Sequence, residues 1–134
     1  MSEQMKTDWR EMSAGRELDR VVAERLGWTD IAPRYDRFDE HEISPLQGIP
    51  PSGGTTYYVI GRYSTDADAA LALLEGCFYT LRGTPDSYEG EMLYRCSIDG
   101  KAGDGVILPS IKYTVAKTPA LAIVRAWLSW KDAQ

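Results

Sequence analysis

The chain is poor in the side chains that most often carry out catalysis. Its 134 residues include one histidine, His41, and two cysteines, Cys77 and Cys96. A serine or cysteine nucleophile needs a neighbouring base and an orienting group, and His41 lies in a charged stretch. Two cysteines without a CxxC spacing predict neither a disulfide framework nor a zinc site. We therefore expect buried, reduced thiols, no enzymatic activity, no metal and no cofactor.

Long apolar runs are also missing, since no stretch approaches the roughly 20 residues that span a bilayer. The first ten residues, MSEQMKTDWR, mix both charge signs and lack the apolar centre of a targeting signal. A net charge of −5 and a pI near 4.9 oppose the phosphate contacts on which nucleic-acid binding depends. We expect a soluble, cytoplasmic protein with no membrane or nucleic-acid partner.

The composition that is present is that of a globular domain, with 43% hydrophobic and 26% charged residues. A chain of this length is expected to form a single domain, 1–134, and to bury roughly two thirds of its unfolded surface. Residues 1–12 show no sustained period and are predicted to be a flexible lead-in. Residues 28–55 are rich in proline and glycine, which predicts a long loop without a long helix or a central strand.

Three segments have the apolar spacing of a surface helix together with terminal signals. The first, 14–26, has Ser13 as its predicted cap, Gly27 as its stop, and an apolar stripe of Leu18, Val21, Val22 and Leu26. The second, 65–75, follows side-chain oxygens at residues 64–66 and ends at Gly76. The third, 119–131, opens with Thr118 as cap and a proline in the first turn.

Four segments are rich in β-branched and aromatic residues or alternate in polarity, as strands do: 57–63, 77–82, 91–98 and 111–117. The connections after residue 76 are too short for crossover helices, so the sheet is predicted to be mainly antiparallel. We expect an α+β fold of the α-β-α sandwich type, in which a small four-stranded sheet packs with about three helices.

Three segments together, AGRELDRVVAERLGW, RYSTDADAALALLEG and AKTPALAIVRAWLSW, resemble the small phage proteins of the phage ABA sandwich domain family. The resemblance covers about a third of the chain and implies an α/β sandwich and a phage or prophage source. It implies no reaction, because the function of that family is generally unknown. The chain departs from the family mostly in residues 28–55 and in the turns.

The helix start at 64–66 is the site that the sequence favours. Free amides and the helix dipole attract an anion there, and Arg62 precedes the helix start. Ordinary capping explains the same residues without a ligand, so both interpretations stay open. The candidate ligand-binding residues are Arg34, Tyr57, Tyr58, Arg62, Tyr63, Ser64, Thr65, Arg95 and Thr118.

Our functional hypothesis is a binding protein that encloses a nucleotide-derived ligand and so sequesters a host signal used in antiphage defence. Tyrosine faces suit a base, and arginines or amides suit phosphates. The alternative is a protein-protein inhibitor or adaptor that acts on a host protein, and a carboxylate-dependent hydrolase ranks third. We expect a homo-oligomer, most simply a dimer that closes a ligand pocket with a second copy.

Overall fold

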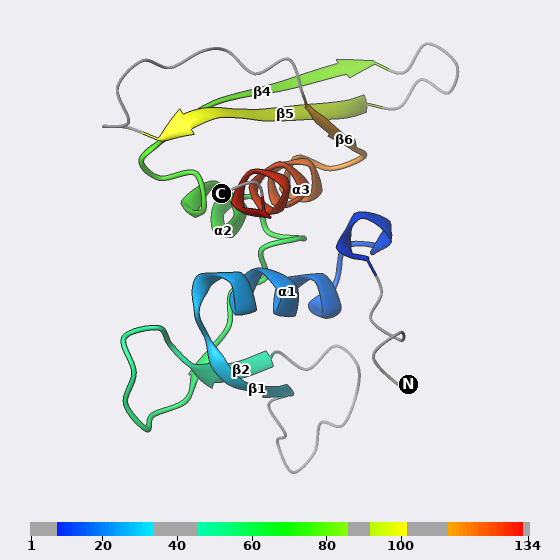
Figure 1. Cartoon of the computed structure of the whole chain (residues 1–134). Helices are drawn as coiled ribbons and strands as arrows, with labels where there is room; N and C mark the ends of the chain where they lie inside the picture. Colours follow the sequence, from blue (N-terminus) through cyan, green and yellow to red (C-terminus); the bar gives the residue numbers. More distant parts are fainter. Residues whose placement is uncertain (1–7, 34–45, 86–91, 102–112, 133–134) are drawn as a thin grey trace. The chain divides into compact units, whose positions relative to one another are not determined.

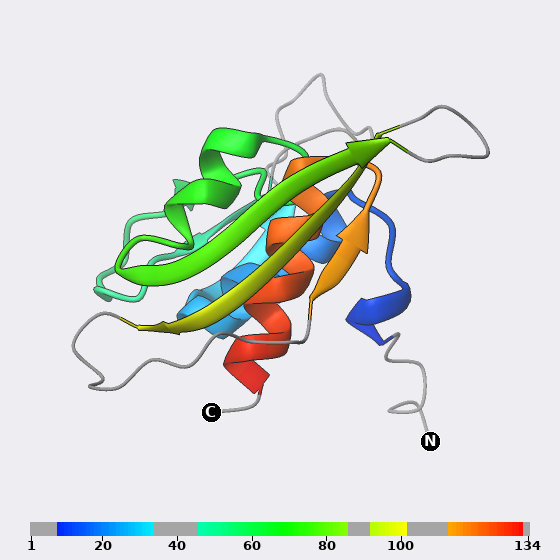
Figure 2. The same cartoon turned by 90° about the horizontal axis from the view of Figure 1, so that it is seen from above.

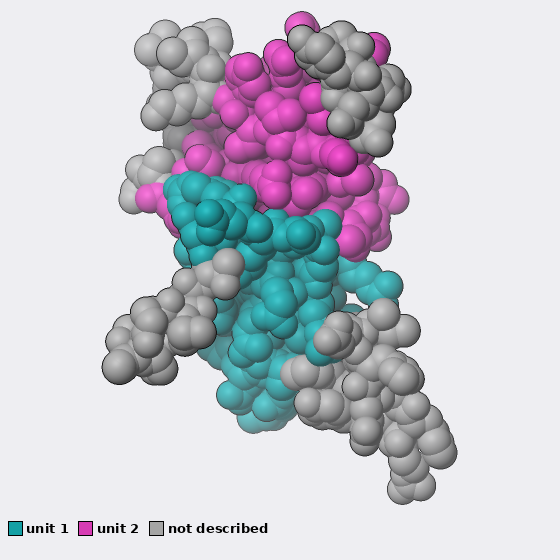
Figure 3. Space-filling view, turned by 90° about the vertical axis from the view of Figure 1, so that its right-hand side faces the viewer, with its two compact units in different colours: residues 1–62 teal, residues 63–134 magenta. Residues whose placement is uncertain are grey.

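The computed structural model describes residues 8–33, 46–85, 92–101 and 113–132. The chain divides into two compact units, residues 1–62 and 63–134, which are coloured separately in Figure 3. Each unit combines helix with antiparallel sheet, so the predicted α+β class is confirmed. The single predicted four-stranded sheet is wrong, because the structure has two three-stranded sheets.

The first unit begins with a short 3-10 helix, η2 (Trp9–Glu11), inside the predicted lead-in. Asp8 caps it by accepting a 3.0 Å hydrogen bond from the Arg10 amide, and Trp9 is buried. Helix α1 (Arg16–Leu26) follows. The predicted cap at Ser13 is wrong, since α1 starts too late for that side chain to reach its first amides, and Gly15 is the N-cap without a side-chain bond.

The end of α1 agrees with the prediction. Gly27 adopts a left-handed conformation, with φ of 104°, and its amide bonds to the carbonyls of the last turn. The buried face of α1 is rotated from the predicted stripe, because Asp19 and Ala23 are buried while Val21 and Leu26 are half-buried. Asp19 lies outside the apolar stripe predicted for this helix and would be expected to face water, so its burial corrects that expectation.

The first sheet has the order β1-β2-β3, and all of its pairs are antiparallel. Its strands are β1 (Thr29–Pro33), β2 (Leu46–Ile49) and β3 (Tyr58–Val59). Two of them lie inside residues 28–55, and β2 is the central strand, which corrects the expectation that this segment contains none. Pro33 ends an edge strand and Pro50 follows β2, so neither removes a central ladder bond.

The close approach of β1 to β2 explains why the central strand has a glycine at position 48. A Cβ atom there would lie 2.9 Å from the Thr29 carbonyl oxygen and 3.2 Å from Cγ1 of Ile31. The backbones of β1 and β2 approach so closely at this point that only glycine fits without displacing the neighbouring strand. The glycine that suggested a loop in the sequence is thus required by the close approach of two strands.

The second unit begins with a turn and then α2 (Ala67–Ala72), which is shorter than the predicted 65–75. Asp66 is the N-cap and accepts a 3.0 Å hydrogen bond from the Asp68 amide. After Ala72 the backbone changes to three-residue turns, with Leu74 N bonded to the Leu71 carbonyl. These tighter turns end the α-helix early, and Gly76 still has the predicted left-handed φ, 81°.

The second sheet has the antiparallel order β4-β5-β6. The strands β4 (Cys77–Pro85) and β5 (Met92–Lys101) confirm the predicted hairpin and extend it, and β6 (Thr114–Ala116) lies within the predicted 111–117. The predicted strand 57–63 contributes only β3, whose pairing partner is β2. It therefore belongs to the other sheet.

Helix α3 (Pro119–Asp132) packs on β5 and β6 and also contacts α2, as Figures 1 and 2 show. Thr118 caps it, as predicted, by accepting a 3.2 Å hydrogen bond from Leu121 N. Thr114 in β6 donates from Oγ1 to the Ala122 carbonyl at 2.8 Å, which fixes the helix against the sheet. The core of this unit includes Leu74, Cys96, Ile98, Ala116, Ala120, Ala122, Ile123, Val124, Trp127 and Leu128.

Both cysteines are free thiols, and Cys96 is fully buried beside α3, whereas Cys77 is half-buried. Burial raises the pKa of Cys96 to about 12, with a smaller contribution from the negative charge of Asp99. The Cys96 thiol is therefore uncharged and unreactive at neutral pH.

Candidate functional site

The candidate site is built around a β-bulge in β1. Thr29 pairs with Ile49 and Ala32 pairs with Gln47, so Asp30 and Ile31 together oppose the single residue Gly48. Asp30 has φ of 53°, the only positive value of a non-glycine residue among those described. Aspartate tolerates this left-handed region better than most residues. The bulge turns the Asp30 side chain out of the regular strand alternation, as bulges near binding sites often do.

Arg20 of α1 stabilises the bulge. Its Nη2 donates a 3.1 Å hydrogen bond to the carbonyl of Ile31, one of the two β1 residues that oppose Gly48. Its Nε lies 3.7 Å from Oε2 of Glu24, one helical turn later. A planar guanidinium can make both contacts at once and still keep donors for a ligand. The α1 surface and β1 are thereby held in one arrangement.

Tyr57 fixes the carboxylate of Asp30 from the side of β3. The Tyr57 hydroxyl donates a 3.1 Å hydrogen bond to Oδ2 of Asp30, which is 27 positions earlier in the chain. This hydrogen bond raises the pKa of the Tyr57 phenol, and the negative charge of Asp30 adds to the effect. At neutral pH the contact therefore joins a neutral phenol to a carboxylate acceptor.

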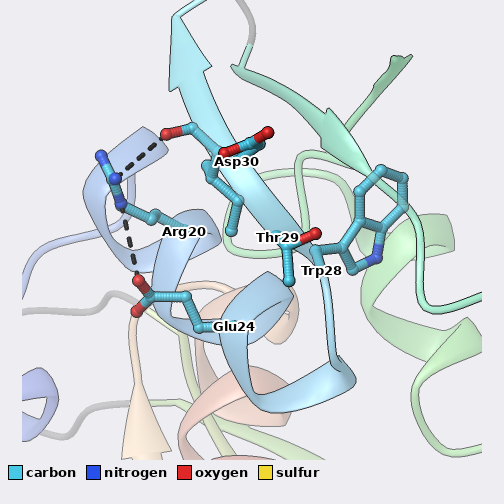
Figure 4. Close-up of a pocket in the computed structure, with 6 residues that line it drawn as sticks. Arg20, Glu24, Trp28, Thr29 and Asp30 are labelled. Atoms are coloured by element: carbon cyan, nitrogen blue, oxygen red, sulfur yellow. Dashed lines mark hydrogen bonds and ion pairs between the residues drawn. The ribbon is translucent and has the colours of Figure 1, made fainter. Parts of the chain in front are cut away.

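These contacts border an open pocket of about 400 Å³ in the first unit. Figure 4 shows the side chains of Arg20 and Glu24 at one end and Trp28 at the other, with Thr29 and Asp30 between them. The volume lies within the range of small-molecule sites, which is roughly 300–1,000 Å³. The pocket thus offers one guanidinium, two carboxylates, a hydroxyl and an indole to a small polar ligand.

The nine candidate residues from the sequence are divided between the two units. Arg34 lies outside the described residues. Of the others, Tyr57 bonds to a pocket residue, Asp30. Tyr58 and Arg62 are exposed elsewhere in the first unit, and the remaining five, Tyr63, Ser64, Thr65, Arg95 and Thr118, belong to the second unit.

The helix start at 64–66 looks less suited to an anion than the sequence suggested. Asp66 supplies the capping oxygen, so a carboxylate already occupies the position that an anion would take. Helix α2 has six residues, which limits its dipole. Ser64 is fully buried, while Arg62 and Thr65 are exposed. Ligand contact by Arg62, Tyr63 and Ser64 stays a prediction.

Sequence reasoning missed most of the pocket. Arg20 and Glu24 lie outside the apolar stripe predicted for the first helix, on the side expected to face water. Trp28 and Asp30 lie at the start of the predicted loop 28–55. One signal in the chain was informative: an aromatic residue and a carboxylate, Trp28 and Asp30, follow directly after the helix stop at Gly27. The bulge itself depends on pairing with β2 and has no local signature.

Across the described ranges, no three His, Cys, Asp or Glu side chains lie close enough to form a metal site. The acidic stretch 36–42 lies outside those ranges. None of the described helices combines the length and the apolar character needed to cross a bilayer.

Solved structures with a similar fold include a phage protein from Bacillus cereus ATCC 14579, determined at 2.0 Å. The TM-score is 0.53 at 16% sequence identity, and the match covers 95% of this chain and 93% of that one. No protein-family model matches the chain, and no curated protein sequence does. The chain therefore resembles a phage protein in its fold, and at this level of identity the resemblance concerns the fold alone.

Proposed function

We propose that this chain is a phage-type binding protein of the ABA sandwich kind, which holds a small nucleotide-derived ligand without transforming it. By doing so it sequesters a host nucleotide signal used in antiphage defence. The observation that carries the proposal is the open pocket of about 400 Å³ beside the β1 bulge, which is lined by residues that include Arg20, Glu24, Trp28 and Asp30.

The chemistry of the pocket suits the nucleoside part of such a ligand. The carboxylates of Asp30 and Glu24 are acceptors for ribose hydroxyls and for exocyclic amino groups of a base. The indole of Trp28 offers an apolar, aromatic surface for a base. Two carboxylates against one guanidinium disfavour phosphate in the pocket itself. The phosphates of a bound nucleotide would then point away from Glu24 and Asp30.

The side chains of the pocket are held in place before any ligand arrives. Arg20 is fixed by the Ile31 carbonyl at 3.1 Å, and Asp30 is fixed by the Tyr57 hydroxyl at 3.1 Å. A preorganised site loses less conformational freedom on binding and therefore gains affinity. Such a site is suited to holding a scarce ligand tightly, as sequestration requires.

The phage context is supported by the fold comparison, and the resemblance expected from the sequence points the same way, although no family model matches the chain. The chain resembles the phage ABA sandwich domain in three segments, and its fold resembles that of a Bacillus cereus phage protein. A small phage protein that binds a nucleotide would act on the metabolism or the signalling of its host. This reasoning favours an anti-defence role within the host cell over a role in the virion.

The decisive experiment is to identify the small molecules that copurify with the protein. The protein is purified from bacteria with and without an active nucleotide-signalling defence, then denatured, and the released small molecules are analysed by mass spectrometry. We expect a nucleotide-derived compound from the defence-active cells only. Asp30→Asn and Trp28→Ala should release much less, whereas Asp68→Asn, an exposed acid on α2, should release as much as the wild type.

The proposal fails if no nucleotide is released from the wild type in either preparation. It also fails if Asp30→Asn, Trp28→Ala and Asp68→Asn all release wild-type amounts. A thermal melt of each variant confirms that a lower yield of ligand does not reflect unfolding. Titration calorimetry with the identified compound then gives the affinity of the refolded protein.

We further propose that the protein forms a two-fold dimer through the edge of β4, which pairs with no described strand other than β5. This strand has nine residues and is the edge of its sheet, with Phe78 51% exposed and Tyr79 also exposed. Long edge strands with apolar side chains and few charges pair readily with another copy. An antiparallel β4–β4 contact is symmetric and does not cover the sheet face that is turned away from α3 in either copy.

A second candidate function is inhibition of a host protein. Tyr57, Tyr58 and Val59 are three consecutive exposed apolar residues, and Tyr58 is 55% exposed. Clustered exposed apolar side chains are typical of protein interaction sites. Affinity capture of one host protein in stoichiometric amount by the wild type, lost in Tyr58→Ser, would favour this function over the first.

A further inference from the structure

The sheet β4–β5–β6 has one face turned away from α3, and two arginines lie side by side on it. Arg82 pairs with Arg95 in the β4–β5 register, and Arg95 pairs with Val115 of β6. The neighbour of Val115 is Thr114, whose Oγ1 donates to the α3 carbonyl of Ala122. Because successive side chains point to opposite faces of a sheet, Val115, Arg95 and Arg82 all point away from the helix.

This arrangement is unfavourable without a ligand. Directly opposite residues of an antiparallel pair have Cβ atoms roughly 4.5–5.5 Å apart, and like charges at this spacing destabilise the sheet. Both arginines are exposed. Within the described part of the chain, neither forms an ion pair with a carboxylate. A cross-strand pair of cations that has no carboxylate partner among the described residues is an arrangement that an anionic ligand would stabilise.

One of the two guanidiniums is already positioned by an aromatic ring. Cζ of Arg95 lies 5.1 Å from the centroid of the Tyr113 ring, in a cation-π contact. Tyr113 is 54% exposed, so the ring and the guanidinium form one accessible surface. A guanidinium held in this way loses less freedom when it binds an anion.

We propose that Arg82 and Arg95 form a binding site for a phosphorylated small molecule on this open sheet face. A diphosphate carries enough negative charge to compensate both guanidiniums, and its several oxygens match two planar forks of donors. A single carboxylate would compensate one arginine and leave the other in repulsion. The inference goes beyond the proposed function, since it concerns the second unit, and it holds whether or not a nucleotide occupies the pocket of the first unit.

Calorimetric titration of the full chain with sodium pyrophosphate at low ionic strength tests the site. We expect saturable binding by the wild type and a rise in Kd of about tenfold or more in Arg82→Gln and in Arg95→Gln. The matched control is Arg10→Gln. Arg10 is also exposed and lies 4.3 Å above an aromatic ring, that of Trp9, but it faces the carboxylate of Asp8. Its replacement should change Kd less than twofold.

A fourth variant separates the geometry of the forks from charge. Arg82→Lys keeps the charge but loses the planar pair of donors, so its Kd should lie between those of the wild type and Arg82→Gln. Circular dichroism confirms that each variant is folded. If Arg10→Gln and Arg82→Gln weakened pyrophosphate binding equally, the loss would reflect net charge alone, and the proposed site would be overturned. Absence of saturable pyrophosphate binding by the wild type would overturn it as well.

Discussion

The Tyr57 hydroxyl donates a 3.1 Å hydrogen bond to Oδ2 of Asp30, a residue that the β1 bulge holds at φ of 53°. The two residues are far apart in sequence: Asp30 lies in the edge strand β1, and Tyr57 directly precedes the other edge strand, β3. Their contact links the bulge to the segment that leads into β3. It is also the point where a tyrosine predicted from the sequence joins the pocket that the structure reveals.

The first prediction concerns the ionisation of Tyr57. Its pKa is raised by the hydrogen bond to Asp30 and by the charge of that residue. The contact therefore stabilises the protein below the ordinary tyrosine pKa of about 10 and is lost as the pH rises through the higher folded-state value. Subtracting the tyrosinate absorbance of Tyr57→Phe from that of the wild type during a pH titration should give the pKa of Tyr57. In Asp30→Asn this pKa should be lower. An unchanged titration in Asp30→Asn would contradict the contact.

A second prediction tests the backbone of the bulge. Asn adopts a positive φ nearly as readily as Asp, whereas a β-branched residue is strained there. We expect Asp30→Val to lower the free energy of unfolding by about 1 kcal/mol or more, and Asp30→Asn to change it by less than about 0.5 kcal/mol. Urea denaturation measures both values. Equal midpoints for the two variants would show that the residue is not held in the left-handed region.

A third prediction concerns the close approach of β1 and β2. The added methyl group in Gly48→Ala would lie 2.9 Å from the Thr29 carbonyl oxygen, and a backbone atom cannot move aside cheaply. We expect a loss of about 1–3 kcal/mol in the free energy of unfolding. Gln47→Ala, the adjacent half-buried position of the same strand, is the control and should lose less. A neutral Gly48→Ala would argue against the β1–β2 register.

The fourth prediction follows from the pKa of about 12 at the buried Cys96. The unfolded thiol ionises near pH 9 while the folded one stays protonated, so unfolding releases a proton between these pH values. Stability should therefore fall by up to about 1.4 kcal/mol per pH unit in this window and should be unaffected below it.

The pH dependence of unfolding in Cys96→Ala isolates this effect. Its slope between pH 9 and 11 should be shallower than that of the wild type, whatever its absolute stability. Thiol labelling at pH 8 provides a second check, because half-buried Cys77 should react before Cys96. Parallel slopes in the two proteins would mean that Cys96 titrates normally.

The fifth prediction concerns assembly. Light scattering should give about twice the chain mass of 15.0 kDa. Phe78→Lys places a charge on the exposed β4 edge and should shift the protein to the monomer. Met92→Lys makes the same change at an exposed apolar residue of β5, which is not an edge strand, and should leave the dimer intact. A monomeric wild type at tens of micromolar would refute the dimer.

The candidate site was predictable from the sequence only in part. Tyr57 was recognised because it starts an aromatic run, and Arg95 because it is a strand arginine. Trp28, Asp30 and Arg20 come together because two residues of β1 oppose one residue of β2. The sequences of β1 and β2 do not by themselves specify this register. The pairing of Arg82 with Arg95 likewise depends on the β4–β5 register.

The sequence by itself determined the features that depend on near neighbours. Gly27 ends α1, Thr118 begins α3, and the hairpin of β4 and β5 forms where strand residues flank a short connection. Each of these depends on side chains and amides within a few positions, so the local pattern contains all of the information.

Tertiary structure alone decided how the strands combine. Residues 28–55 contain two strands because the Gly48 backbone has a partner in β1, and the segment predicted to complete a four-stranded sheet pairs with β2 instead. A strand satisfies its backbone hydrogen bonds on a partner that is distant in sequence, so its own residues do not specify which partner or register it takes. The bulge, the pocket and the arginine pair all follow from that choice.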